Sequence, residues 1–95
     1  IPQFFWDDVG SWGALDRHLE KDPHGNILRG NVVMVEGNDN IVIGDSNSII
    51  SMVGVKDLIV VKNGDRFLIC SKKQDQEIKK LLSIIAQNRD NLKYL

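Results

Sequence analysis

The sequence predicts a mainly β protein: a short β-solenoid (parallel β-helix) flanked by an N-terminal helix and a C-terminal capping helix. Short runs rich in Val and Ile recur between residues 27 and 70, and both residues favour strands because branching at Cβ restricts χ1. Polar segments containing Gly, Asn and Asp separate these runs, at roughly 8 to 10 residues per strand and turn. Apolar residues at helical spacing lie on both sides of this region.

The predicted strands could belong to a solenoid or to an antiparallel meander. They are residues 32–35, 41–43, 49–53, 58–61 and 67–70. A meander with one solvated face would alternate apolar and polar residues, and these runs are nearly continuous. This favours a solenoid, in which each strand stacks on the previous coil and the chain turns at polar corners. Asn63-Gly64 is nevertheless the strongest two-residue hairpin signal, so we expect the solenoid to end in a hairpin.

Residues 1–22 are expected to form a loop that runs into a helix. Ser11 is a good N-cap, because its hydroxyl accepts a hydrogen bond from a free backbone N–H one turn on. Trp12, Leu15 and Leu19 then have the spacing of one apolar helix face. Pro23 disfavours helical geometry in the residue before it, so the helix should stop near Asp22. We place a domain boundary here, with residues 1–22 as the tail of an α/β domain and residues 23–95 as the β domain.

The last part of the chain is predicted to be one helix over residues 72–92. Ile78, Leu81, Leu82 and Ile85 recur at the spacing of an amphipathic helix. We expect this apolar stripe to cap the open end of the β array, because a solenoid must not expose an apolar edge.

Composition limits the possible classes of protein. The chain has 95 residues, a net charge of −1 and no basic stripe, which argues against nucleic-acid binding. No stretch is long and apolar enough to span a bilayer. A single cysteine, Cys70, cannot form an internal disulfide, so we expect a cytoplasmic protein. Because almost nothing precedes the large side chains of residues 4–6 to bury them, we interpret the chain as the C-terminal piece of a longer protein.

The segment "WDDVGSW" at residues 6–12 is the strongest candidate site. Asp7 and Asp8 have no Lys or Arg within eight residues, and carboxylates are the usual protein ligands of Mg²⁺. Gly10 lets a ligand approach the backbone, and the N–H groups that open a helix after it favour an anion such as phosphate. Metal and phosphate together are typical of phosphoryl-transfer chemistry. The alternative is that one aspartate caps the helix and the other is solvated.

Three segments resemble the bacterial mannose-1-phosphate guanylyltransferases, a branch of the sugar-nucleotide pyrophosphorylases. "WDDVGSWGAL" resembles their W-x-D-V-G-S-W motif, and "GNILRGNVV" resembles their G-N-x-x-x-G-D-V segment. The stretch from "VGVKDLIVV" to "EIKKLL" resembles a third segment, in the same order and spacing. The resemblance therefore covers nearly all of the chain. It implies a nucleotidyltransferase domain followed by a small parallel β-helix, and a reaction of mannose 1-phosphate with GTP that gives GDP-mannose and pyrophosphate.

The resemblance also implies roles for single residues. Asp8 would be the Mg²⁺ ligand, Gly10 would lie beside the sugar phosphate, and Asp7 occupies a variable position of the motif. Gly13 and Asn31 stand where the family more often has Asp, and neither departure touches the metal position. The family's glycine-rich nucleotide loop, Pro-Lys motif and upstream metal-binding aspartate are not among these 95 residues, so we expect the fragment itself to be inactive.

Two other functions stay open. The chain could be a non-catalytic β-solenoid module for oligomerisation or packing, or part of a pyrophosphorylase for another sugar nucleotide. The apolar runs cannot direct every side chain inward, so exposed apolar surface and a homo-oligomer are expected. His18 and His24 have no Cys/His cluster around them, which argues against zinc. Cys70 is expected to be a small buried hydrophobe, and the lysines of residues 72–80 the solvated face of the last helix.

Overall fold

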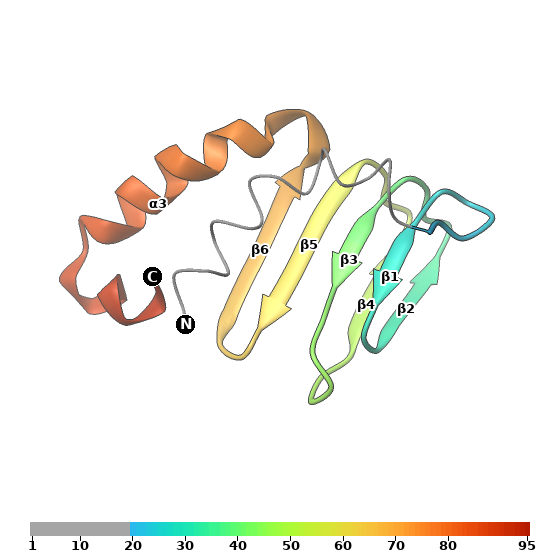
Figure 1. Cartoon of the computed structure of the whole chain (residues 1–95), viewed down its shortest axis with the longest axis horizontal. Helices are drawn as coiled ribbons and strands as arrows, with labels where there is room; N and C mark the ends of the chain where they lie inside the picture. Colours follow the sequence, from blue (N-terminus) through green and yellow to red (C-terminus); the bar gives the residue numbers. More distant parts are fainter. Residues whose placement is uncertain (1–19) are drawn as a thin grey trace.

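The structure is a computed structural model that describes residues 20–95. Six strands precede the helical C-terminal part (Figure 1). The strands are β1 (Ile27–Arg29), β2 (Val32–Val35), β3 (Ile41–Ile43), β4 (Ile50–Val53), β5 (Leu58–Asn63) and β6 (Arg66–Ser71). The helical elements are the 3₁₀ helix η1 (Lys72–Glu77), the α-helix α3 (Ile78–Ala86) and the 3₁₀ helix η2 (Arg89–Tyr94). The predicted N-terminal helix and the boundary at residue 22 depend on residues outside the described part, and both stay predictions.

The strands wind as a parallel solenoid, as predicted. One sheet has the order β1-β3-β5-β6, in which β1, β3 and β5 pair in parallel. A second sheet pairs β2 with β4, also in parallel, and a parallel bridge joins Asn38 to Lys56. Each strand of one coil thus pairs with the equivalent strand of the next coil. The antiparallel meander is excluded as the architecture of these coils.

Successive coils differ in length at one corner. Ile27 pairs with Ile41 and Ile41 pairs with Ile59, so the second coil contains more residues than the first. The chain passes from β1 to β2 through residues 30–31, but from β3 to β4 through residues 44–49. This longer corner projects beyond the sheets in Figure 1. The strand register is unaffected by the difference, because the additional chain lies in the loop.

The four-stranded sheet carries apolar residues on both faces, and its buried core cluster lies on one of them. Neighbouring residues of a strand point to opposite faces. Ile27, Ile41 and Ile59 are in register and almost fully buried, and they form one cluster with Ile78 of α3. The alternate residues Leu28, Val42 and Val60 are in register on the other face, where Leu28 and Met34 of β2 line the same cavity. That face is therefore the interior of the solenoid, and α3 packs on the outside.

Left-handed residues recur at equivalent corners. A residue with positive φ lies two positions before β1 and β3, namely Gly25 (81°) and Asp39 (60°). For β5 the corresponding residue, Asp57 (58°), directly precedes the strand. The residues directly after β2 and β4 repeat the feature, with Glu36 at 60° and Gly54 at 68°. A single left-handed residue changes the chain direction locally, which explains why the strands stay so short.

The predicted hairpin joins β5 to β6, with its turn one residue later than the dipeptide suggests. Asn63 is the last residue of β5 and pairs with Arg66, so the loop residues are Gly64 and Asp65. Gly64 has a φ of 60°, and a positive φ at the first loop position alone is the feature of a type II′ turn. Asn63 is therefore a strand residue, and glycine supplies the conformation that the turn requires.

The single helix predicted for residues 72–92 is wrong in extent, since the structure has three shorter pieces. The Ser71 hydroxyl caps η1 by accepting from the Lys73 N–H, and Gln74 has non-helical dihedrals of −125° and 23°. Asn88 is extended, and its side chain accepts from the Asp90 N–H, which starts η2. These short polar side chains compete with the helical backbone for hydrogen bonds. The predicted helical stripe is confirmed only in α3, where Ile78 is buried and Leu82 packs against the core.

Two strand predictions also need correction. The strand β1 was missed, and the run predicted to start at residue 49 starts at Ile50, while Ile49 is 59% exposed.

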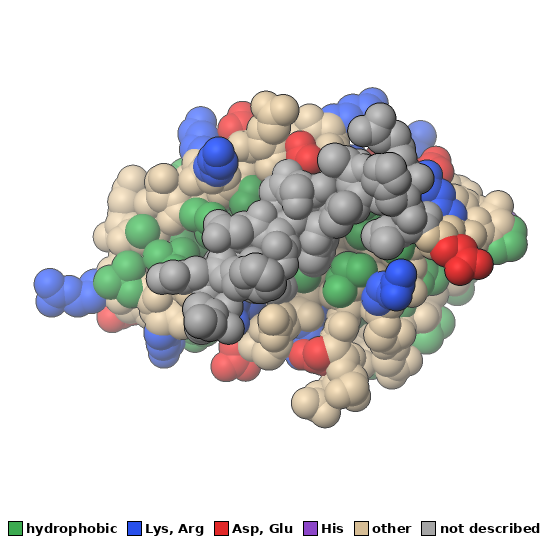
Figure 2. Space-filling model, viewed as in Figure 1, with side chains coloured by type: hydrophobic (Ala, Val, Ile, Leu, Met, Phe, Trp, Pro, Cys, Tyr) green, Lys and Arg blue, Asp and Glu red, His purple; other side chains and the backbone are tan. Residues whose placement is uncertain are grey.

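Charged side chains of both signs are scattered over the face shown in Figure 2. None of the helices in residues 20–95 has the length and hydropathy needed to cross a membrane.

Candidate functional site

The residues that the sequence singles out for chemistry are not in the described part of the chain. Asp8, the candidate Mg²⁺ ligand, Gly10, the candidate sugar-phosphate neighbour, and Asp7 all lie before residue 20. Their assignments stay predictions. The described residues have three features of their own: a cavity, a buried polar ladder and a charged cluster.

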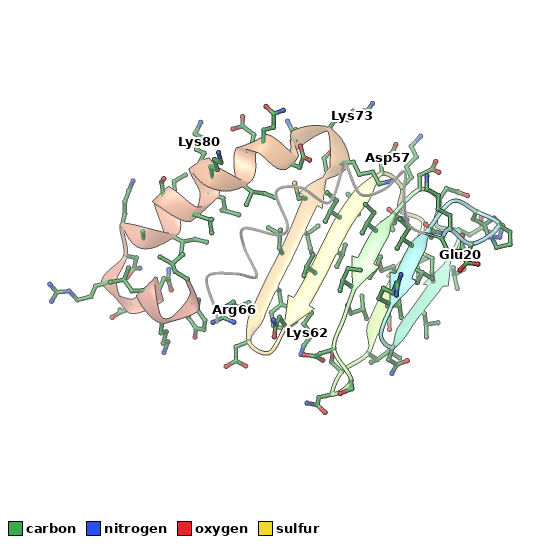
Figure 3. All side chains as sticks on the ribbon, viewed as in Figure 1. Glu20, Asp57, Lys62, Arg66, Lys73 and Lys80 are labelled. Carbon is green, nitrogen blue, oxygen red and sulfur yellow. The ribbon has the colours of Figure 1, made fainter. Side chains whose placement is uncertain are left out.

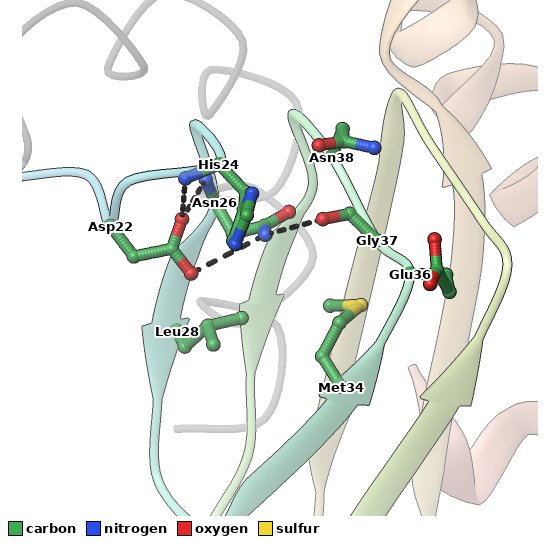
Figure 4. Close-up of a pocket in the computed structure, with 8 residues that line it drawn as sticks. All are labelled: Asp22, His24, Asn26, Leu28, Met34, Glu36, Gly37 and Asn38. Atoms are coloured by element: carbon green, nitrogen blue, oxygen red, sulfur yellow. Dashed lines mark hydrogen bonds between the residues drawn. The ribbon is translucent and has the colours of Figure 1, made fainter.

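A cavity of about 270 Å³ opens at the β1 end of the solenoid (Figure 4). Leu28 and Met34 point toward each other across it and form its apolar walls. Its rim is polar. The remaining lining residues are Asp22, His24, Asn26, Glu36, Gly37 and Asn38.

The Asp22 carboxylate at this rim serves the local turn. Its Oδ1 accepts from the backbone N–H groups of His24 and Asn26, both at 2.9 Å, and its Oδ2 accepts from the Asn26 side chain at 3.3 Å. The Asn26 N–H, with further help from these neighbours, lowers the pKa of Asp22 below its ordinary value. Asp22 is therefore an ionised turn residue whose acceptor positions are largely used inside the protein.

Two buried asparagines link the coils behind this cavity. Asn26 and Asn40 directly precede β1 and β3 and are 2% and 0% exposed. The Asn26 side chain donates to the Gly37 carbonyl at 2.9 Å and accepts from the Asn40 backbone N–H at 2.9 Å. The Asn40 side chain continues the pattern one coil on, by donating to the Val55 carbonyl at 3.1 Å and accepting from the Leu58 N–H at 3.0 Å. We call this pair the asparagine ladder.

The ladder satisfies backbone groups that a solenoid corner would otherwise bury without partners. Every buried side-chain nitrogen or oxygen in residues 20–95 has a hydrogen-bond partner. Within the same residues, no group of His, Cys, Asp and Glu side chains could hold a metal ion. The hydrogen bonds of the ladder thus support the solenoid frame, and no buried side-chain nitrogen or oxygen of residues 20–95 is left unpaired toward the cavity.

Asp45 holds the long corner against the hairpin. Its Oδ2 accepts from Lys62 Nζ at 2.8 Å and from the Gly64 N–H at 3.1 Å, while its Oδ1 accepts from Ser48 Oγ at 2.8 Å. The Lys62 ammonium, followed by the Ser48 and Gly64 donors, holds the pKa of Asp45 well below its usual range. Figure 3 shows Lys62 and Arg66 at this hairpin end, while Lys73 and Lys80 lie along η1 and α3.

Comparison with known proteins identifies this frame. Residues 30–84 match the MannoseP isomerase/GMP-like beta-helix domain family. The chain belongs to this family. The match covers β2 to β6, including the hairpin, and most of α3, so the family's β-helix domain corresponds to the parallel coils that follow β1.

Several relatives of this chain are named mannose-1-phosphate guanylyltransferase. A mannose-1-phosphate guanylyltransferase from Salmonella muenchen is 35% identical over 86 residues, which is 90% of this chain and 18% of that protein. One from Escherichia coli is 33% identical and covers 88% of this chain and 18% of its own length. The crystal structure of a protein described as mannose-1-phosphate geranyltransferase, from Thermus thermophilus, matches with a TM-score of 0.71 and 33% identity, covering 84% of this chain and 24% of that one. The chain thus spans about 18% of the length of the curated relatives it matches.

The β-helix domain also exposes apolar side chains. Val33, Val35 and Val53 are 51%, 54% and 72% exposed, and they point outward because Met34, between the first two, lines the cavity. Phe67 and Ile69 of β6 are 68% and 72% exposed on the other sheet.

The Cys70 thiol is half-buried at the end of β6. Burial, with a smaller contribution from the Asp75 carboxylate, raises the pKa of Cys70. A raised pKa keeps the thiol protonated and unreactive, which agrees with its predicted role as a small hydrophobe.

Sequence reasoning missed the asparagine ladder and the role of Asp45. The ladder had a sequence signal, because Asn-Ile opens both β1 and β3 after a Gly or an Asp. The polar corner that contains Asp45 gave only a turn signal in the sequence, because the partners of Asp45, Lys62 and Gly64, lie 17 and 19 residues away.

Proposed function

We propose that this chain is the C-terminal β-helix part of an enzyme that makes GDP-mannose from mannose 1-phosphate and GTP. The observation that carries the proposal is the agreement between relatives: proteins named mannose-1-phosphate guanylyltransferase match about nine tenths of this chain at 33% and 35% identity. The "WDDVGSW" motif supports the same activity independently of the β-helix, because it precedes residue 30, where the family match begins.

In the proposed enzyme, Asp8 is a ligand of Mg²⁺ and Gly10 lies beside the sugar phosphate. The carboxylate of Asp8 is the kind of hard oxygen ligand that Mg²⁺ prefers. The ion, when bound, would neutralise charge that develops on the reacting phosphates. Residues 20–95 contain no group of three or more His, Cys, Asp and Glu side chains that could hold a metal ion on its own. The β-helix supplies the frame, and we propose that this chain alone is inactive and that the enzyme is cytoplasmic.

Substitution of the two adjacent aspartates tests this proposal. In the longer enzyme, Asp8→Asn keeps the shape of the side chain and removes the charged ligand, so we expect kcat to fall on the order of a hundredfold or more. Asp7→Asn is the matched control, at the variable position of the motif, and should have a far smaller effect. Equal and small losses in both variants would assign the pair to helix capping and solvation. GDP-mannose formation by this chain alone, free of host enzymes, would contradict the proposed inactivity.

A second candidate function is a non-catalytic oligomerisation or packing module. The outward-facing valines of β2 and β4 favour it, because exposed apolar patches mark interaction surfaces. We propose a homo-oligomer joined through this β face or through the aromatic segment at residues 4–6. This role is compatible with the enzymatic one, since a β-helix can assemble subunits while another domain performs the chemistry.

A further inference from the structure

The only Asn-Gly dipeptide of the chain occupies a chemically sensitive position. Asn63 ends β5 and Gly64 begins the turn, and both residues are exposed. No hydrogen bond from a residue of the described part holds the Asn63 side chain in place. The glycine after it has no side chain to shield its backbone nitrogen. The hairpin therefore presents the pair of groups that react with each other when asparagine deamidates.

The reaction needs only water and hydroxide. Hydroxide removes the proton from the Gly64 backbone nitrogen, which then attacks Cγ of Asn63. A new C–N bond forms, the bond from Cγ to the side-chain nitrogen breaks, and ammonia leaves a five-membered succinimide. Water then opens the ring at either carbonyl, which gives aspartate or isoaspartate. No group is oxidised or reduced.

The position of Asp45 opposes this reaction in two ways. Its Oδ2 lies 3.1 Å from the Gly64 nitrogen and accepts a hydrogen bond from it, so the N–H of the attacking atom is already hydrogen-bonded. The carboxylate also places a negative charge beside a nitrogen that must itself become negative, and like charges at this distance repel. The second partner of the same oxygen, Lys62 Nζ at 2.8 Å, keeps Asp45 ionised and in place.

The conformation of Asn63 adds a geometric barrier. Asn63 is paired with Arg66 as the closing pair of the hairpin, so its backbone is extended. An extended backbone does not bring the next nitrogen over the side-chain carbonyl carbon, and the turn must open before the ring can close. Asp45 bonds to Lys62 on one side of Asn63 and to Gly64 on the other, and it therefore resists that opening.

We propose that Asn63 is a deamidation site and that Asp45 sets its rate. Loss of the Asp45 contact exposes Gly64 to attack, and the product places a new carboxylate near Asp45 and Asp65. Isoaspartate would also lengthen the backbone by one methylene at the closing pair of the hairpin. Asp45 acts here as a positioning residue that protects a neighbouring peptide bond.

The test is peptide mapping of the full chain incubated at mildly alkaline pH. We expect deamidation of Asn63, read as loss of the side-chain amide and labelling by an isoaspartyl methyltransferase, to be on the order of tenfold faster in Asp45→Asn than in the unsubstituted chain. Asp65→Asn is the matched control, because it makes the same chemical change one residue beyond Gly64 without touching the Gly64 nitrogen. Its rate should equal that of the unsubstituted chain. A folded Asp45→Asn variant with an unchanged rate would overturn the proposal.

A second measurement keeps the proposal testable if Asp45→Asn does not fold. In the unsubstituted chain the Gly64 amide should be protected from hydrogen exchange, and Asn63 should deamidate on the order of tenfold more slowly than in urea. Equal rates in the native state and in urea, or an unprotected Gly64 amide, would show that Asp45 does not control the site.

Discussion

Asn26 and Asn40 are the only polar side chains among the most buried residues of the described part. Each lies directly before a strand and bonds to backbone groups of neighbouring corners. At the third equivalent position the Leu58 N–H donates to Asn40 and closes the series. The side-chain amides of the ladder thus hold neighbouring coils together by hydrogen bonds, while the apolar core holds them together by packing.

Removing Asn40 should be costly. Asn40→Ala removes the partner of the Leu58 N–H and one of the two donors to the Val55 carbonyl, so we expect a loss of about 2 kcal/mol of unfolding free energy. Urea denaturation followed by circular dichroism measures this loss. Asn38→Ala is the matched control, since Asn38 is exposed and bonds through its backbone; it should change stability by less than about 0.5 kcal/mol. Similar losses in both variants would contradict the role of the ladder.

Asp45 should make the free energy of unfolding depend on pH in the acid range. Its folded-state pKa lies below the ordinary value of 3.8, so the unfolded chain binds a proton at this side chain more readily than the folded chain does. The stabilisation is therefore fully present above about pH 4 and is lost as the pH falls further. We expect Asp45→Asn to lose less stability than the unsubstituted chain between about pH 6 and pH 3 in urea titrations. A parallel decline in the two proteins would show that the Lys62 contact does not stabilise the folded state.

Such residue-scale contacts were only partly predictable. The Asn-Ile pairs before β1 and β3 were visible in the sequence, but asparagine beside a strand is commonly an exposed turn residue. Burial distinguishes the two roles, and burial depends on how coils of unequal length stack on one another. The pairing of Asp45 with Lys62 likewise depends on how the long corner folds back on the hairpin.

The corners are the elements that define the solenoid, and two of them differ in how tightly they are packed. Gly30 and Gly54 both have positive φ, at 86° and 68°. A Cβ on Gly30 would meet the Gly44 carbonyl oxygen at 2.8 Å, whereas a Cβ on Gly54 would meet nothing within 4 Å. The corner at Gly30 thus needs glycine for space as well as for conformation.

This difference gives a matched pair of substitutions. Gly54→Ala should cost only the backbone strain, about 1 to 2 kcal/mol. Gly30→Ala should cost about 3 kcal/mol or more, because the backbone of the next coil must also move. Denaturant unfolding of both variants measures the two losses of unfolding free energy. If Gly54→Ala were the more destabilising change, the close approach of Gly30 to Gly44 would not be present in solution.

At the level of elements, the sequence predicted what depends on local pattern. The Val- and Ile-rich runs became β2 to β6 nearly at the expected residues. The strand β1 was missed because it is very short and ends in an arginine. The C-terminal helix was predicted too long because apolar periodicity continues across Asn88, whose side chain instead caps a new turn. The turn at Gly64 shows the same limit, since the dipeptide signals a hairpin without fixing which residue carries the positive φ.

For the whole molecule, we predict assembly through exposed apolar surface. The chain should sediment as a dimer or a larger species at micromolar concentration. Val53→Lys and Ile69→Lys are matched in exposure, at 72% each, but lie on different sheets. If the β2–β4 face is the interface, Val53→Lys should give monomers while Ile69→Lys keeps the assembly. Assembly that survives both changes would point to the aromatic segment at residues 4–6, and a monomer at all loadings would contradict the prediction.

The solenoid of residues 20–95 was predictable because short, continuous apolar strands leave few alternatives to this architecture. The candidate metal site was predicted from a motif, and its residues Asp8 and Gly10 lie outside the described part. The carboxylate pattern alone left capping as an alternative, since one aspartate pair does not define a coordination sphere.

The unequal coils have a consequence for how such a frame can change. The additional residues of the longer coil fit into one corner, while the pairs Ile27–Ile41 and Val32–Ile50 keep their parallel register. Insertions and deletions at this corner therefore leave the stacked strands undisturbed. Ser46 and Asn47, exposed at its tip, lie next to the Asp45 anchor that ties the corner to the hairpin. A foreign peptide grafted between these two residues would be displayed on a rigid base, so this corner is where the domain can acquire new recognition loops without a new fold.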